Sequence, residues 1–351
     1  MNHEGTKRIV VIGAGSVGAS LAYHLASKGA QVTMLEAGGI ASGVTGTSFA
    51  WINTSCAGID PIAALRGDAI AAWRQLATQV PGLTVCWHGA LSYGTQDGRV
   101  SPESILIDRS RIARLEPQLR RPPQQAVHEP EQGAVDTVAA THALLAAAEA
   151  LGATVRTHTP VLGFTVRDAQ VTGVETAAGR IEADMVVLAA GTGTASLAAQ
   201  LGVDLPILAS PAIFLRYQAP PSLVRGIISN HAMEVRQAED GTMLAAEDYV
   251  DDAPENQPAA MVLRTASAIR EELEGAESSA PEFACIGLRP MPADGVPVIG
   301  YLPNIKGVYV CAMHPGVVLA VVVGQLASGE IVTGEPAPAL EACRPARFLA
   351  C

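Results

Sequence analysis

The sequence predicts an α/β protein in which a domain built on a parallel sheet is interrupted twice by pieces of a second domain, an antiparallel-sheet α+β unit. A length of 351 residues exceeds what a single ordinary hydrophobic core serves. Continuous apolar runs at 8–12 and 185–190 are typical of strands in a sheet that is covered on both faces. Runs of alternating polarity at 212–217 and 242–246 are instead typical of half-exposed antiparallel strands.

The N-terminal segment carries the signals of a strand, a helix and a second strand. Residues 8–12 are a β-branched run, and 16–28 follow with helical periodicity that ends at Gly29. Residues 31–35 form the second strand, so the three elements together predict a βαβ unit. The small and polar residues 37–58 are expected to form a long loop of the kind that often serves function.

The remaining elements follow from the same periodicities. Helices are expected at 60–80, 137–150, 256–274 and 317–331. Strands are expected at 161–166, 171–176, 185–190, 212–217, 226–235, 242–246, 283–288 and 308–311. The order predicts a first domain made of residues 1–85, 130–205 and 285–351, and a second domain made of residues 86–129 and 206–284.

Charge and composition exclude several classes of protein. The 23 Lys and Arg residues against 34 Asp and Glu give a net charge of −11, which repels phosphate, so we expect no nucleic-acid partner. A hydrophobic content of 49% with only 16% charged residues excludes disorder. The six cysteines form no CxxC pair, so we expect no disulfide scaffold and no metal site, but buried thiols in a reducing cytoplasm.

Two apolar stretches resemble targeting segments. Residues 7–26 have the charge and hydropathy of a signal peptide, but three regularly spaced glycines interrupt them. Residues 307–329 are long enough to cross a bilayer. His314, Pro315 and Gly316 break that run, and a break would leave backbone groups unpaired in lipid. We therefore expect a buried strand, a turn and a buried helix, with no integral membrane span and no export signal.

The glycines at the start of the chain form a GxGxxG motif, Gly13-Ala14-Gly15-Ser16-Val17-Gly18. It lies between the first expected strand and helix, which is the context that makes the motif specific for dinucleotides. The first glycine permits a tight turn, the second lets a pyrophosphate approach the backbone, and Gly18 lets the helix pack closely on the strand. The helix N-terminus then offers free N–H groups to the phosphates, so a Rossmann-like domain is expected.

Glu36 ends the second strand, 23 residues after Gly13. A carboxylate at that point accepts hydrogen bonds from a ribose diol and repels a 2′-phosphate, so NADP is disfavoured. The motif alone fits FAD and NAD equally well. The alternative is a chance glycine-rich turn, which the strand, helix and acid in register make less favoured.

Four segments resemble those of one family, in the family's order: 36–48, 185–192, 285–300 (with Gly-Leu-Arg289-Pro) and 308–320. The family is that of FAD-dependent amino-acid and amine oxidoreductases, the glycine oxidase and D-amino-acid oxidase/dehydrogenase superfamily. The resemblance implies a Rossmann-like FAD-binding domain with an inserted substrate domain. It implies FAD as cofactor, and we expect noncovalent FAD because the position used for covalent attachment falls on Gly287, two residues from Cys285.

The resemblance also implies which residues contact FAD, in the glycine motif, in the loop 42–49, in strand ends and in the last helix. The expected contacts are Gly13, Gly15, Ser16, Val17, Gly18, Glu36, Ser42, Thr47, Ser48, Phe49, Val161, Gly191, His314, Gly316, Val317, Val318 and Leu319. The N-terminus of the last helix would face the flavin pyrimidine ring, where a positive helix end stabilises the negative charge of the reduced state. Pro315 removes one donor there.

In the family, the arginine of the GLRP segment holds the substrate carboxylate, and here that residue is Arg289. Its planar fork binds both carboxylate oxygens; the alternative is a structural salt bridge. Tyr249 and His314 are weaker candidates for the substrate site. The implied reaction is oxidation of the C–N bond of an amino acid or related carboxylated amine, with hydride transfer to flavin N5 and no obligatory side-chain base.

Several alternatives stay open at this point. The substrate could be a secondary amine, either an N-methyl or a cyclic amino acid. The chain could be the FAD-binding subunit of a hetero-oligomeric dehydrogenase, or an NAD-binding protein without flavin. The electron acceptor could be oxygen, a quinone or a carrier protein, and the chain could act as a homo-oligomer or with a partner subunit.

Overall fold

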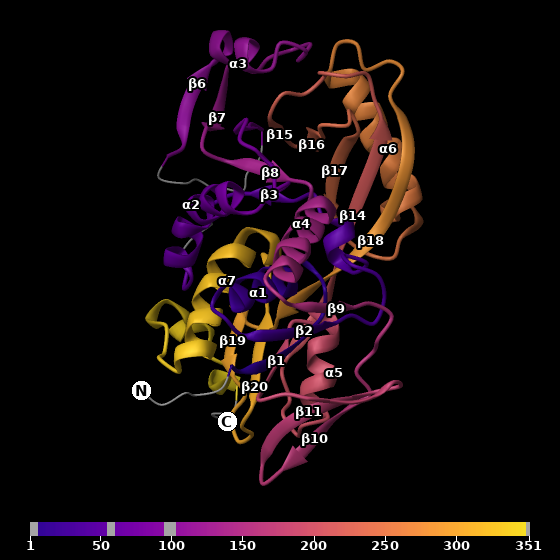
Figure 1. The fold of residues 1–351 in the computed structure, drawn as a ribbon. Coiled ribbons are helices and arrows are strands. Elements are labelled where there is room, and N and C mark those ends of the chain that lie inside the picture. Colours follow the sequence, from indigo (N-terminus) through magenta and orange to yellow (C-terminus); the bar gives the residue numbers. More distant parts are fainter. Residues whose placement is uncertain (1–5, 55–59, 95–102, 349–351) are drawn as a thin grey trace.

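The computed structural model describes residues 6–54, 60–94 and 103–348, which form two lobes (Figure 1). Cys56 and Cys351 lie outside the described residues. The N-terminal and C-terminal thirds of the chain meet in one lobe around a parallel sheet, and the long strands β14 (Ile207–Gln218) and β18 (Ala280–Pro292) extend from there into the second lobe.

The first lobe contains a six-stranded sheet in the order β19-β20-β13-β1-β2-β9. All neighbours in it are parallel except β19, which pairs antiparallel with β20. The strands are β1 (Arg8–Ile12), β2 (Gln31–Leu35), β9 (Thr154–Arg156), β13 (Met185–Leu188), β19 (Val298–Tyr301) and β20 (Val308–Ala312). The order confirms the expected α/β class and the βαβ unit at the N-terminus.

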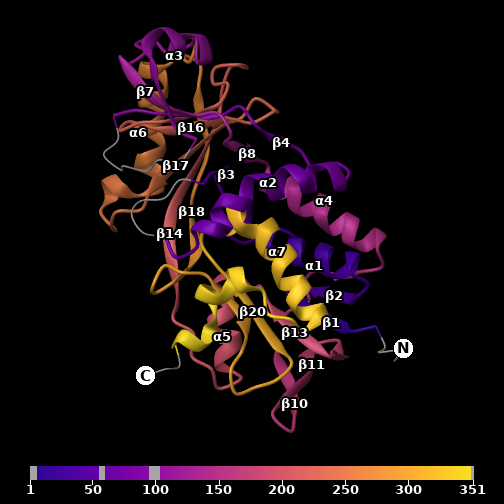
Figure 2. The same cartoon turned by 90° about the vertical axis from the view of Figure 1, so that its left-hand side faces the viewer.

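Alternate side chains of this sheet enter two different cores, which confirms that both faces are covered. Ile9 and Val11 of β1 pack with four helices, whereas Val10 and Ile12 pack with a small antiparallel sheet and a short helix. The four helices lie on one side of the sheet (Figure 2): α1 (Ser16–Ser27), α2 (Ala63–Gln79), α4 (Thr137–Ala150) and α7 (Gly316–Thr333). The other face carries β10 (Gly163–Arg167), β11 (Gln170–Thr176), β12 (Gly179–Glu182) and α5 (Thr194–Ala199).

The second lobe contains an eight-stranded sheet in the order β18-β14-β17-β16-β15-β5-β7-β6. Its further strands are β5 (Ala90–Ser92), β6 (Ile105–Asp108), β7 (Gln125–Glu129), β15 (Ile227–Ser229), β16 (Glu234–Gln237) and β17 (Met243–Asp248). Helices α3 (Arg109–Leu115) and α6 (Pro258–Glu272) contribute to its core, which confirms an α+β unit. One expectation needs correction, because β5 and β15 pair in parallel and the sheet is therefore not wholly antiparallel.

A fourth sheet, of three short strands, lies between the lobes in the order β3-β8-β4 (Figure 1). Its strands are β3 (Trp51–Ile52), β8 (Gly133–Val135) and β4 (Val85–Cys86). Five 3-10 helices complete the described structure: η1 (Val44–Thr47), η2 (Gly191–Gly193), η3 (Pro254–Asn256), η4 (Pro338–Cys343) and η5 (Pro345–Phe348).

Three boundaries differ from those that the sequence predicts. The strand expected at 226–235 is the hairpin β15–β16, because the Asn230 side chain accepts hydrogen bonds from the N–H groups of Ala232 and Met233 and turns the chain. The loop expected at 37–58 contains η1 and β3. The domain boundary expected after residue 284 falls within β18, which stays paired with β14 as far as Pro292, so we propose that the boundary follows Pro292.

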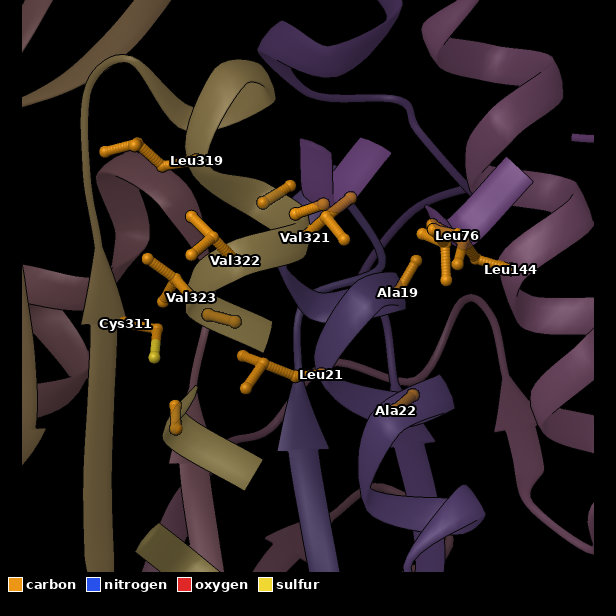
Figure 3. Packing of buried hydrophobic residues seen from close by; sticks show 14 of the residues in the cluster. Ala19, Leu21, Ala22, Leu76, Leu144, Cys311, Leu319, Val321, Val322 and Val323 are labelled. Carbon is orange, nitrogen blue, oxygen red and sulfur yellow. The ribbon is translucent and has the colours of Figure 1, made fainter. Parts of the chain in front are cut away.

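Helix α7 is the one helix in the described part of the chain that is long and apolar enough to cross a membrane. In the structure, 61% of that 18-residue window is buried. Leu319 and Val323 of α7 share a core with Leu21 of α1 and Leu76 of α2 (Figure 3). The strand β20, the turn and the buried helix α7 are therefore as expected from the sequence.

A buried histidine between α1 and α7 predicts how stability depends on pH. His24 is only 5% exposed, its Nε2 has no hydrogen-bond partner, and burial together with Lys28 lowers its pKa to about 4. The unfolded chain therefore takes up a proton near pH 6.5, whereas the folded protein does not until about pH 4. Since the unfolded state binds more protons, the free energy of unfolding should fall by about 2 kcal/mol between pH 7.5 and 5 through this group.

Urea unfolding at the two pH values measures this loss, and His24→Leu is the matched variant without the titrating ring. The variant should lose less stability than the wild type over the same pH interval. Equal losses in both proteins would show that another group is responsible.

Candidate functional site

A cavity of about 1240 Å³ lies where the two lobes meet. The first lobe lines it with the turns that follow β1, β2, β13 and β20, and with the loop around η1. The eight-stranded sheet lines it from the other side with residues of all eight strands and the start of the loop after β5. Turns that are distant in sequence converge here because the carboxyl ends of parallel strands share one edge of a sheet.

The β1–α1 turn is built so that only glycine fits. Gly13 has φ of +107°, and a Cβ there would lie 2.4 Å from the carbonyl oxygen of Ala189. A Cβ on Gly18 would lie 1.9 Å from the oxygen of Gly13, so α1 packs directly on the turn. A Cβ on Gly15, which lines the cavity, would lie 2.9 Å from Thr45 Oγ1. The bare backbone and the N-terminus of α1 therefore suit a pyrophosphate.

The carboxylate of Glu36 is held in a fixed position at the end of β2. Its Oε2 accepts a hydrogen bond of 2.8 Å from the N–H of Ala14, and Oε1 accepts one of 2.8 Å from the N–H of Gly38. Glu36 also lines the cavity. A carboxylate with further lone pairs beside the glycine turn is suited to a ribose diol.

Most of the predicted FAD contacts line the cavity. They are Gly13, Gly15, Ser16, Val17, Glu36, Ser42, Thr47, Ser48, Phe49, Val161, Gly191, His314, Gly316, Val317 and Val318. Two expected contacts do not. Leu319 is fully buried in the helical core on the far side of the first turn of α7, and Gly18 serves the packing of α1.

The turn between β20 and α7 presents the start of a long helix to the cavity. Pro315 is the N-cap, and α7 begins at Gly316. Trp73 of α2 donates from Nε1 to the oxygens of Val317 and Val318, both at 3.2 Å, which holds the first turn in place. The free N–H groups of this turn lie at the cavity and favour negative charge there.

Arg289 lies on β18 opposite Ser210 of β14 and lines the cavity. Its Nη2 donates to Ser210 Oγ and to the oxygen of Pro211, both at 3.1 Å. Its Nε is buried and has no hydrogen-bond partner. No salt bridge joins Arg289 to a carboxylate among the residues that the structure describes, so the alternative of a structural ion pair finds no support.

Tyr249 does not line the cavity. It follows the last residue of β17, packs against the core beneath α6, and donates from its hydroxyl to Asp252. Tyr249 is half-buried, and the hydrogen bond to Asp252 raises the pKa of its hydroxyl. The expectation that Tyr249 reaches the substrate therefore needs correction.

The sequence does not predict the wall that the eight-stranded sheet contributes. From β14 to β6, the register places one side chain of each strand in a row across the sheet, and all seven members of the row line the cavity. The row consists of Phe214, Ala246, Glu234, Ser229, Ser92, Val127 and Leu106. A period of two gives the face of each strand, but strand order and register come only from the folded sheet.

Two further features near the cavity are absent from the sequence analysis. Thr45 Oγ1 accepts a hydrogen bond of 3.1 Å from the N–H of Ser16 and so ties the η1 loop to the glycine turn. Arg66 and Asp60 form an ion pair of 2.6 Å that lines the cavity at the start of α2. Within the described ranges, no group of three or more His, Cys, Asp or Glu is arranged to hold a metal ion.

Comparison with known proteins decides the family. The family of FAD dependent oxidoreductases (DAO) matches residues 8–329. The chain belongs to this family. Its members depend on FAD, and the glycine turn, the fixed Glu36 and the two helix N-termini at the cavity fit that cofactor.

The relatives show which proteins the chain is similar to. It is 27% identical to glycine oxidase of Pseudomonas putida, over 94% of this chain and 96% of the relative. It is 30% identical to 4-methylaminobutanoate oxidase (formaldehyde-forming) of Paenarthrobacter nicotinovorans, over 60% of this chain and 27% of that protein. The solved structure of L-amino acid deaminase from Proteus vulgaris matches with a TM-score of 0.86 at 20% identity, covering 99% of this chain and 96% of that one, and shows the same fold.

Proposed function

We propose that the protein oxidises the C–N bond of an amino acid or a related carboxylated amine. The observation that carries the proposal is Arg289, a guanidinium on the cavity wall with a buried Nε that lacks a partner and with no ion pair to a carboxylate in the described part of the chain. In an FAD dependent oxidoreductase, such a group suits the carboxylate of a small substrate. FAD, when bound, accepts the hydride that leaves the substrate carbon.

The chain's own residues would bind and orient FAD and the substrate. The N-terminus of α1 would hold the phosphates, and Glu36 would accept hydrogen bonds from the ribose. The N-terminus of α7 would stabilise the negative charge that reduction places on the flavin. Arg289 would fix the substrate carboxylate and so the position of its α-hydrogen, which is the contribution that orientation makes to the rate.

A secondary amine is the second candidate substrate. The similarity to 4-methylaminobutanoate oxidase, whose name describes a methylated amine, favours it. N-methyl and cyclic amino acids carry the same carboxylate for Arg289 and the same C–N bond. The acceptor of the electrons would be oxygen, a quinone or a carrier protein. The chain itself would act as a homo-oligomer or with a partner subunit.

An anaerobic flavin-bleaching screen tests the proposal. The purified protein is mixed with glycine, D- and L-amino acids, sarcosine and proline derivatives, and the loss of absorbance at ~450 nm is followed. A carboxylated amine should bleach the flavin, and the ratio of rates for sarcosine and glycine separates secondary from primary amines. If no carboxylated amine bleaches it, the proposal fails.

We also predict that FAD is held without a covalent bond. Cys285 does not line the cavity, and burial raises the pKa of its thiol, which keeps it in the unreactive protonated form. Precipitation with trichloroacetic acid should leave the yellow colour in the supernatant. A yellow pellet that persists after washing would contradict this prediction.

We place the protein in the cytoplasm. The described cysteines Cys86, Cys285, Cys311 and Cys343 are free thiols, which suits a reducing compartment. Immunoblotting of fractionated cells tests this placement.

A further inference from the structure

Arg236 is a buried guanidinium that the proposed chemistry does not use. It lies on β16 and is only 6% exposed. Its Nε donates to the oxygen of Phe49 at 2.7 Å, and its Nη2 donates to the oxygen of Val135 at 3.2 Å. The guanidinium carbon lies 5.6 Å from the centre of the Phe49 ring. None of the salt bridges within the described ranges involves Arg236.

The strand neighbours of Arg236 are apolar, and the core beside it draws on both lobes, while Asp136 and Asp240 act on its charge electrostatically. The register sets Arg236 between Ile227 of β15 and Leu244 of β17, on the same face of the eight-stranded sheet. Both neighbours belong to a small core that also contains Phe49 and Ala134 from the first lobe and the sheet between the lobes. Arg236 therefore bridges the two lobes, with its backbone in the eight-stranded sheet and its hydrogen bonds to Phe49 and Val135 outside that sheet.

This is an unfavourable place for a charge unless the charge has a purpose. A buried cation loses its hydration, and carbonyl oxygens replace it less well than a carboxylate does. Burial lowers the pKa of Arg236 to about 10, so the group stays charged at neutral pH. Apolar side chains fill such cores at a lower cost in free energy. The two carbonyl groups to which Arg236 donates therefore indicate what the charge is needed for.

The Phe49 carbonyl adjoins the part of the cavity wall that is expected to touch FAD. Thr47, Ser48 and Phe49 all line the cavity; Thr47 is the last residue of η1, and β3 begins at Trp51. The N–H of Ala50, the residue after this segment, donates a hydrogen bond of 3.1 Å to Ser48 Oγ. The oxygen of Phe49 is bound from the opposite lobe by Arg236.

We propose that Arg236 is a positioning residue for the FAD site. Through the Phe49 carbonyl, it holds the segment 47–49 against the eight-stranded sheet. The inference rests on FAD being bound in this cavity, and it deepens the proposed function. When Arg236 is lost, two buried carbonyl oxygens lose their donor, the segment is released, and the wall that faces the cofactor is no longer fixed.

The experiment compares three variants as holoenzymes. Arg236→Met removes both donors at similar volume, and Arg236→Lys keeps the charge but cannot span both carbonyls. Arg344→Met is the matched control, because Arg344 is also largely buried and binds Glu330 at 2.9 Å and the oxygen of Ala337, but lines no part of the cavity. The Kd for FAD is measured from the flavin fluorescence released on dilution, together with the visible circular dichroism of the bound flavin and Tm.

Arg236→Met should raise the Kd for FAD about tenfold, which corresponds to the loss of about one hydrogen bond to a charged group, and should change the flavin dichroism. Arg236→Lys should give a smaller change in the same direction. Arg344→Met should lower Tm and leave both flavin readouts unchanged. If Arg236→Met does not fold, the lysine variant decides.

A wild-type Kd and dichroism in both Arg236 variants would overturn the proposal, as would equal effects in Arg344→Met. These readouts need no substrate. The proposed amine oxidation can therefore fail in the bleaching screen while the role of Arg236 is still decided, and the reverse also holds.

Discussion

Arg289→Met is expected to raise the apparent KM for a carboxylated amine by about 10- to 150-fold for each charge-assisted hydrogen bond that is lost. The range follows from 1.5–3 kcal/mol per bond to a charged group, at roughly 1.4 kcal/mol for each factor of ten. The effect should fall on KM and on kcat/KM through the lost binding of the carboxylate, and kcat should also fall because Arg289 would fix the position of the α-hydrogen. Steady-state kinetics with the best substrate from the bleaching screen measure it.

Two controls separate this role from a structural one. Arg289→Lys keeps the charge but not the planar fork, so it should also raise KM steeply. Ser210→Ala removes an acceptor of Arg289 and leaves the guanidinium in place, so its effect should be small. The Kd for FAD should stay close to the wild-type value in both Arg289 variants. An unchanged KM in Arg289→Met would remove Arg289 from the substrate site.

The FAD end of the site could be predicted because its signals are local. The motif from Gly13 to Gly18, the strand before it and Glu36 after the second strand all lie within one βαβ unit. The close approach of Gly18 to the oxygen of Gly13 is a contact between residues of the same motif, so it leaves a fixed spacing in the sequence.

The substrate end could not be predicted in the same way, because distant segments build it. Ser92 faces the cavity only because β5 pairs in parallel with β15, which lies far along the chain. Arg236 meets Phe49 across 187 residues. Neither contact corresponds to a fixed spacing in the sequence. Tyr249 was proposed as a substrate contact from its residue type alone, and in the structure it packs on the core and does not line the cavity.

Leu319 shows a different limit of prediction from sequence. The helix that contains it was predicted correctly, but not which side chains of that helix line the cavity. Helix α7 begins at Gly316 and has a high mean hydropathy. No polar face therefore marks the side of the helix that meets the cavity. All three of Val317, Val318 and Leu319 contact the core shared with α1, but only Val317 and Val318 also line the cavity. The difference depends on the angle at which α7 enters the core, which the turn at Pro315 and the contact with Trp73 determine.

Gly18→Ala should destabilise the protein and weaken FAD binding together. Its Cβ would lie 1.9 Å from the oxygen of Gly13, and that oxygen belongs to the turn itself, so helix α1 must shift to make room. Overpacking against backbone costs about 1–3 kcal/mol of unfolding free energy, and the shift moves the N–H groups that would hold the phosphates. Urea unfolding and fluorescence titration with FAD measure the two effects.

Gly67→Ala is the matched control for this substitution. Gly67 is exposed within α2 and has no atom within 4 Å of the position of an added Cβ, so alanine should raise stability by about 0.5–1 kcal/mol through its helix propensity. The Kd for FAD should not change in this variant. If Gly18→Ala were as stable as wild type and bound FAD as tightly, the close packing of α1 on the glycine turn would not be what shapes the phosphate site. A helix that can move by the width of a methyl group without changing FAD binding does not fix the position of the cofactor.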